Sequence, residues 1–182
     1  PLSLVSFVNA ISTPVGPLSI LERAGVRNGL LRIDDQRRGR VVRYHDLLLS
    51  YARPDPAAVD LFVSARGDHG VWTARGTLTG AAGEPRRLAM RTTDLAVSEL
   101  LGFAEKGVVP FQTDMPLSID VSVDVAADDT LLSVDGAITG GKAALIFDDP
   151  KAPPMQIDAV KGEFRLLQDG SQIAIPAIEL VS

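Results

Sequence analysis

The chain has 182 residues, of which 46% are hydrophobic and 23% are charged, with 18 Lys and Arg against 23 Asp and Glu. This hydrophobicity and a formal net charge of only −5 exclude intrinsic disorder, and a pI near 5.0 argues against nucleic-acid binding, which needs a basic surface. The lack of cysteine excludes a disulfide scaffold, a cysteine nucleophile and thiolate metal sites.

Residues 1–24 predict a short helix followed by a linker that contains proline and glycine. The apolar residues with the i, i+3, i+4, i+7 spacing of an amphipathic helix are Leu4, Val5, Phe7, Val8 and Ile11. Pro14 and Gly16 would end this helix. No apolar run reaches the length of about 18 residues that predicts a membrane span. Because the chain starts without Met and stops in an apolar run, we expect a segment of a longer protein.

From residue 26 onward the hydrophobic period changes to two, which predicts β-strands. The predicted strands are residues 26–34, 41–51, 59–67, 71–78, 88–92, 117–125, 130–138, 142–148, 157–167 and 171–180. The clearest is 117–125, where aliphatic residues alternate with Ser and Asp. Short turns between the strands predict a mainly β protein with one or two short helices. Its antiparallel meander would form either a curved sheet or groove, or an open sandwich.

One segment between the strands is long enough for a second helix, at residues 94–106. Thr93 or Asp94 is its predicted cap, Leu100 and Phe103 belong to its apolar stripe, and Gly107 would stop it. This helix divides the β-rich segment 25–182 into halves at about 25–92 and 108–182, and we expect it to plug or flank a groove.

The residue types that carry chemistry occupy positions where turns explain them. Paired carboxylates at predicted strand ends are Asp34 and Asp35, Asp128 and Asp129, and Asp148 and Asp149. His45 precedes Asp46 within a strand, where neighbouring side chains point to opposite faces, and His69 falls in a turn. We therefore expect no catalytic residue, no metal site and no cofactor, and the protein is predicted not to be an enzyme.

Arginines cluster in two places, in and after a turn and again in a later strand. They are Arg37, Arg38, Arg40 and Arg43, and then Arg86, Arg87 and Arg91. The simpler interpretation is a solvated loop and strand edge. The alternative is contact with anionic lipid headgroups or with a protein partner.

A longer pattern carries a family resemblance. Residues 115–125 read Met-Pro-Leu-Ser-Ile-Asp-Val-Ser-Val-Asp-Val and are followed by an acidic turn, the strand 131–138 and a Gly-Gly turn. Residues 153–164 then lead into a final hairpin. Nearer the start of the chain, residues 26–33 and 46–49 form a pattern of a strand with a central glycine, an acidic turn and an Asp-Leu-x-Leu strand. Over about residues 25–182 this order resembles the AsmA-like superfamily, in particular the YhdP/TamB-type large periplasmic envelope proteins of Gram-negative bacteria.

The resemblance implies a periplasmic segment of a protein that is anchored in the inner membrane. Such proteins form extended β-grooves that carry phospholipid towards the outer membrane, in outer membrane biogenesis, and no catalytic residues come with the family. The partner would be phospholipid or another acyl-chain lipid. The expected lipid-facing residues are Leu117, Ile119, Val121, Val123 and Val125, with a second set at Leu47, Leu49 and Tyr51.

Two other functions fit the same alternation. A compact β-sandwich without a lipid groove would serve as an interaction or scaffold module of a periplasmic protein. A carbohydrate-active enzyme that uses paired carboxylates is the weaker alternative, because aromatic platforms for sugars are scarce. If the strand edges of the sheet are open, two copies in isolation would pair edge to edge as a dimer.

Overall fold

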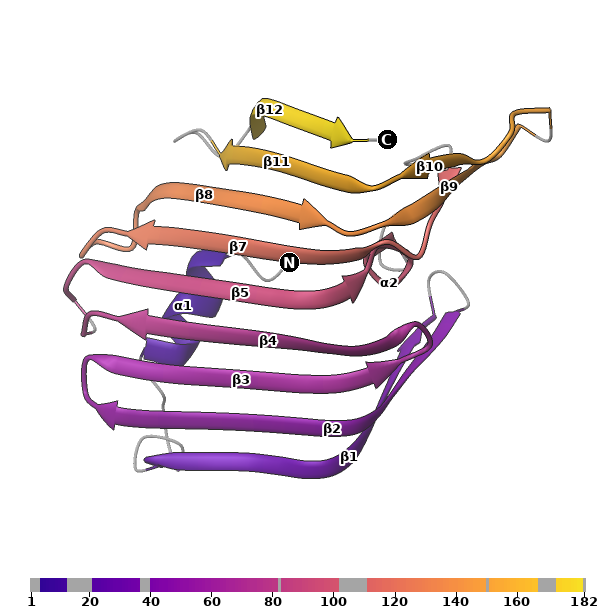
Figure 1. Cartoon of the computed structure of the whole chain (residues 1–182). Helices are drawn as coiled ribbons and strands as arrows, with labels where there is room; N and C mark the ends of the chain where they lie inside the picture. The colour runs from indigo at the N-terminus through magenta and orange to yellow at the C-terminus, as the bar shows by residue number, and fades with distance from the viewer. Residues whose placement is uncertain are drawn as a thin grey trace.

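The computed structural model describes residues 4–12, 21–36, 40–81, 83–101, 111–149, 151–166 and 173–181. Its main feature is an antiparallel sheet of nine strands (Figure 1). In spatial order the strands are β1 (Arg23–Asp35), β2 (Arg40–Asp55), β3 (Ala58–Gly67), β4 (Gly70–Thr79), β5 (Arg86–Ala96), β7 (Pro116–Val125), β8 (Leu131–Gly140), β11 (Ala159–Leu166) and β12 (Ile173–Val181). The sheet does not close, so β1 and β12 are its two edges.

A small second sheet lies at one end of the main sheet. It has the order β10-β9-β6 and consists of β6 (Phe111–Gln112), β9 (Ala143–Phe147) and β10 (Met155–Ile157). Because β9 and β10 lie between β8 and β11 in the sequence, their hairpin extends beyond the end of this strand pair (Figure 1). The helices described are α1 (Leu4–Ser12) and the short α2 (Val97–Leu101).

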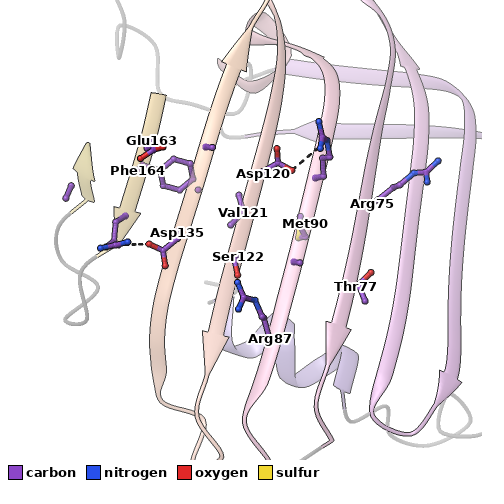
Figure 2. A pocket seen from close by; sticks show the side chains of 16 residues that line it. Arg75, Thr77, Arg87, Met90, Asp120, Val121, Ser122, Asp135, Glu163 and Phe164 are labelled. Atoms are coloured by element: carbon purple, nitrogen blue, oxygen red, sulfur yellow. Dashed lines mark hydrogen bonds and ion pairs between the residues drawn. The ribbon is translucent and has the colours of Figure 1, made fainter. Parts of the chain in front are cut away.

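The two faces of the main sheet differ in chemistry. Paired residues of neighbouring antiparallel strands lie on the same face, so the strand pairing shows which side chains each face carries. One line of paired residues crosses all nine strands on one face, and we call it the apolar row: Val26, Leu49, Val63, Ala74, Thr92, Ile119, Ile138, Gly162 and Ile178. The adjacent line on the other face is the polar row: Gly25, Ser50, Phe62, Arg75, Arg91, Asp120, Ala137, Glu163 and Ala177. Figure 2 looks onto the polar face, with α1 behind the sheet.

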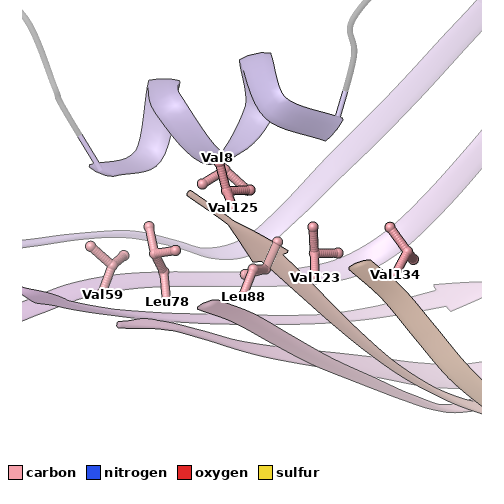
Figure 3. Packing of buried hydrophobic residues seen from close by; sticks show 7 residues of the cluster. All are labelled: Val8, Val59, Leu78, Leu88, Val123, Val125 and Val134. Carbon is pink, nitrogen blue, oxygen red and sulfur yellow. The ribbon is translucent and has the colours of Figure 1, made fainter. Parts of the chain in front are cut away.

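The hydrophobic core lies between α1 and the apolar face, at the middle of the sheet (Figure 3). Its buried members are Val8, Val59, Leu78, Leu88, Val123, Val125 and Val134. A second, smaller cluster consists of Met115, Leu117 and Ile157, at the end of the sheet where β9 and β10 lie. The molecule is therefore one large sheet with local covers on one face rather than two stacked sheets.

The mainly β antiparallel meander with two short helices is confirmed. The two predicted halves form one continuous sheet, because β5 pairs with β7. The predicted helix 94–106 is wrong at its start, since Asp94 to Ala96 belong to β5 and α2 begins at Val97, while residues 102–106 lie outside the described residues. Asp94 has a φ of 58° at a bulge between Thr92 and Leu95, a left-handed conformation that Asp tolerates.

Candidate functional site: the apolar face of the sheet

The apolar row is continuous and only partly covered. No side chain in it is fully buried, and Thr92 is its only residue with a polar side chain. At the β1 side Val26 is 45% and Leu49 is 38% exposed, and at the β12 side Ile178 is 62% exposed. With neighbouring strands about 4.8 Å apart, nine strands give the row a length of about 38 Å. This length accommodates an extended acyl chain that lies across the strands.

β7 contributes its aliphatic side chains to the apolar face of the sheet, as the alternation of residues 117–125 predicts. Val123 and Val125 are buried in the core beneath α1, and Val121 packs against the same cluster. Leu117 belongs to the second cluster, and Ile119 packs against that cluster while it also forms part of the apolar row. The five residues thus share one face, but α1 occupies the surface over Val123 and Val125.

The second expected set lies on β2, nearer the open edge. Tyr51 is half-buried and packs against the core, while Leu49 belongs to the apolar row. Leu47 is half-buried beside Gly29 of β1, where an added Cβ would lie 2.9 Å from Val26 Cγ1 and 3.4 Å from Leu47 Cβ. The close approach of these side chains over a glycine extends the apolar surface onto the edge strand.

A buried arginine holds α1 to this face, which the sequence analysis did not anticipate. Arg86 is 3% exposed, and its Nη1 donates hydrogen bonds to Asn9 Oδ1 at 2.6 Å and to Ser12 Oγ at 3.0 Å. Its Nη2 forms an ion pair with Asp129, whose side chain is half exposed. The sequence contained a signal for this position: Arg86 is two residues before Leu88, so strand alternation places it on the apolar face.

A second arginine contacts the end of the same helix. Arg53 Nη2 donates to the carbonyl oxygens of Ser12 at 2.6 Å and Ile11 at 3.5 Å. Helix carbonyls at the C-terminus lack helical partners and carry partial negative charge, so a guanidinium is a favourable partner for them. We call Arg53 and Arg86, with Asn9 and Ser12, the arginine clamp.

The remaining arginines of the predicted clusters are placed differently. Arg37 and Arg38 and the side chain of Arg40 lie outside the described residues, while Arg43 is exposed. Arg87 lies 3.9 Å from Asp124 and Arg91 lies 3.7 Å from Asp120, measured from Nε to a carboxylate oxygen. The prediction of a solvated cluster is therefore wrong for Arg86, because that side chain turns towards the apolar face.

The polar face carries a hollow of about 990 Å³ (Figure 2). The charged side chains that line it are Arg75, Arg87, Arg91, Arg165, Asp120, Asp135 and Glu163. Arg75 lies over the Phe62 ring, with the guanidinium carbon 5.1 Å from the ring centroid, and is paired across the strands with Arg91. Because carboxylates balance most of these arginines, the hollow is a network of surface ion pairs and not a concentrated positive site.

One of these ion pairs makes a testable titration prediction. The Arg165 side chain donates a hydrogen bond to Asp135, which holds the pKa of Asp135 below its ordinary value of 3.8. Replacing Arg165 by glutamine should raise the pKa of Asp135 towards that value, measured by carboxyl-carbon NMR. Asp128 is the control, because its pKa is lowered by hydrogen bonds from Thr130 and should not change. A depressed folded-state pKa stabilises the protein above pH 3.8, and that contribution disappears as the pH falls through the folded-state pKa.

The residue types that could support catalysis are dispersed. His45 and His69 are both exposed, and Asp46 bonds to Arg66 at 3.0 Å. Asp128 and Asp149 accept hydrogen bonds from turn amides of Thr130 and Lys151, in agreement with their predicted turn role. In the described part of the chain, no three His, Asp or Glu residues come together in a way that could hold a metal ion.

No helix within the described ranges has the length and apolarity needed to cross a bilayer. Comparison with known proteins finds no family model, no curated protein and no solved structure that matches this chain.

Proposed function

We propose that this chain is a non-enzymatic, lipid-binding β-sheet segment of an envelope protein, and that it holds acyl chains along the apolar row. The single observation that carries this proposal is a row of nine paired residues, apolar except for Thr92, that crosses an open sheet and is exposed at both ends. Burial of an acyl chain on such a surface is favourable by about 0.8 kcal/mol for each CH₂ group. It needs a continuous apolar surface and no specific polar contact.

The resemblance to AsmA-like proteins adds the biological setting to this proposal. It supports phospholipid as the ligand, a periplasmic location, and an inner-membrane anchor in the full-length protein. A fusion of alkaline phosphatase, which is active only after export, to the full-length protein tests the location in a Gram-negative cell. Inactive fusions at full expression would remove the envelope setting from the proposal.

Lipid binding is tested with charge substitutions at the exposed ends of the apolar row. Ile178→Glu and Leu49→Glu place a carboxylate in the row and should weaken the binding of cis-parinaric acid, followed by its fluorescence, by at least about tenfold. Ala177→Glu and Ser50→Glu are the matched controls, because each is exposed, one residue away and on the polar face. Native mass spectrometry of the protein purified from bacteria checks whether phospholipid co-purifies.

An interaction module without a lipid site is the second candidate function. It is supported by the burial of Val123 and Val125 under α1, which is typical of an ordinary packed core. In that case neither the wild-type protein nor any variant would bind cis-parinaric acid, and all four glutamate variants would behave alike.

A further inference from the structure

We propose that α1 is a displaceable cover that occupies a second acyl-chain position on the sheet, and that the arginine clamp sets how easily it leaves. This inference rests on the proposed function. On the same face, four residues further along each strand from the apolar row, lies a second line of paired residues, which we call the aliphatic line. It consists of Val59, Leu78, Leu88, Val123, Val134 and Leu166. Figure 1 shows α1 behind this part of the sheet, with its axis crossing the strands as the rows do.

Few apolar side chains of α1 are buried against the sheet. Val8 is fully buried, and Ile11 packs against the cluster, whereas Phe7 is 39% exposed and Ala10 is exposed. A nine-residue helix is shorter than the length at which an isolated helix is stable in water, so its position depends on the contacts that it makes with the sheet. An acyl chain offers the aliphatic line the same kind of contact that Val8 and Ile11 provide.

Polar contacts therefore hold much of the helix in place. Arg86 is bonded to Asn9 and Ser12 from below, and Arg53 contacts the carbonyl end of α1. The Nε atoms of both arginines are buried and have no hydrogen-bond partner among the described residues. A buried hydrogen-bond donor without a partner lowers stability, so these two Nε atoms weaken the arginine clamp in the position where α1 covers the sheet. This arrangement is more consistent with a cover that can open than with a permanent core helix.

The test uses the absence of cysteine in the chain to place one spin label. Ala10→Cys carries a nitroxide on the exposed side of α1, and hexadecanoic acid is the probe. In the otherwise unchanged protein, saturation with hexadecanoic acid should change the nitroxide spectrum from the restricted motion of a label on an ordered helix to the faster motion of a label on a released segment. A nitroxide whose mobility does not increase while hexadecanoic acid binds would overturn the inference and leave the proposed function standing.

The clamp is tested by adding Asn9→Ala and Ser12→Ala, which remove two acceptors of Arg86 and place the strongest helix former at both positions. Mobilisation of the label should then occur at about tenfold lower concentrations of hexadecanoic acid, because a more populated open state lowers the apparent Kd. Asp149→Asn is the control, since it changes a turn hydrogen bond to the Lys151 amide in the β9–β10 hairpin, away from Arg86 and its partners (Figure 1).

The outcomes separate the two proposals. An unchanged concentration for mobilisation in the clamp variant would overturn the role of the arginine clamp. A clamp variant whose label is mobile without the probe, yet whose affinity is unchanged, would show that α1 does not compete with lipid. No binding of hexadecanoic acid by any variant would overturn the proposed function together with this inference.

Discussion

Replacing Gly136 by alanine is expected to lower the free energy of unfolding by about 2 kcal/mol, although it adds only one methyl group. Gly136 in β8 is paired with Phe164 in β11, and the Phe164 ring lies over the glycine where a Cβ would stand. The added atom would collide with the ring, which also packs against the core, so Phe164 must leave its position. Urea denaturation followed by circular dichroism measures the loss.

Gly162 provides the matched control for this substitution. It lies on the same face of the neighbouring strand, and the nearest heavy atoms to its added Cβ are at ordinary distances of 3.6 Å and 3.8 Å. Gly162→Ala should be neutral or stabilising by about 0.5 kcal/mol, because glycine is unfavourable within a strand. A second substitution, Phe164→Leu, should recover part of the loss in the Gly136→Ala protein, which a double-mutant cycle measures. Equal losses at the two glycines would contradict the explanation.

The strands were the most predictable part of the structure, because the apolar face imposes a strict period of two on the sequence. In β7 each odd position from Leu117 to Val125 faces the apolar side, and each even position faces the ion-pair network on the other side. A shift of one residue would place carboxylates on the apolar face, so the register is strongly determined. Alternation of this kind depends only on neighbouring residues and can be seen directly in the sequence.

Pairing between distant segments could not be derived in the same way. The contact of β5 with β7 joins segments on either side of α2, and β8 meets β11 across the excursion that forms β9 and β10. Such pairings are determined by the sum of many side-chain contacts between strands and not by any local motif. The apolar row, which exists only once all nine strands are in register, was therefore inaccessible to a reading of single strands.

Asp94 shows why the helix boundary was misplaced. Aspartate is favoured as a helix cap, but it also tolerates the left-handed conformation that a bulge requires. Asn28, Asp46 and Asp94 all have positive φ angles of 52° to 58° at register shifts within the sheet. One residue type thus signals two structures, and pairing of Leu95 with Leu117 decided in favour of the strand.

The position of Arg86 explains how a charged residue fits an otherwise apolar face. It lies at the start of β5, where Asn9, Ser12 and Asp129 converge from α1 and from the turn after β7. The contacts come from two segments that are distant from β5 in the sequence, so local sequence gives no indication of them. Alternation alone places Arg86 on the apolar side, and only the fold shows that α1 supplies its partners.

Leu88→Ala is expected to cost about 3 kcal/mol, one of the largest losses for a single substitution in this protein. Leu88 is 1% exposed and is paired with Leu78 on one side and with Val123 on the other, beneath α1. A single sheet has no second sheet that can move in to fill the cavity, and α1 is held at the positions fixed by the arginine clamp. Chemical denaturation with urea gives the free energy of unfolding.

Leu132→Ala is the comparison, because the same side chain is removed from a neighbouring part of the sheet where it is 43% exposed. Its cost should remain below about 1 kcal/mol, since nearly half of its surface is already in water and no closed cavity forms. If both variants lost the same stability, the core would not be concentrated beneath α1. In that case the burial of Leu88 beneath α1 would add no more to the free energy of unfolding than the packing of a leucine that is nearly half exposed.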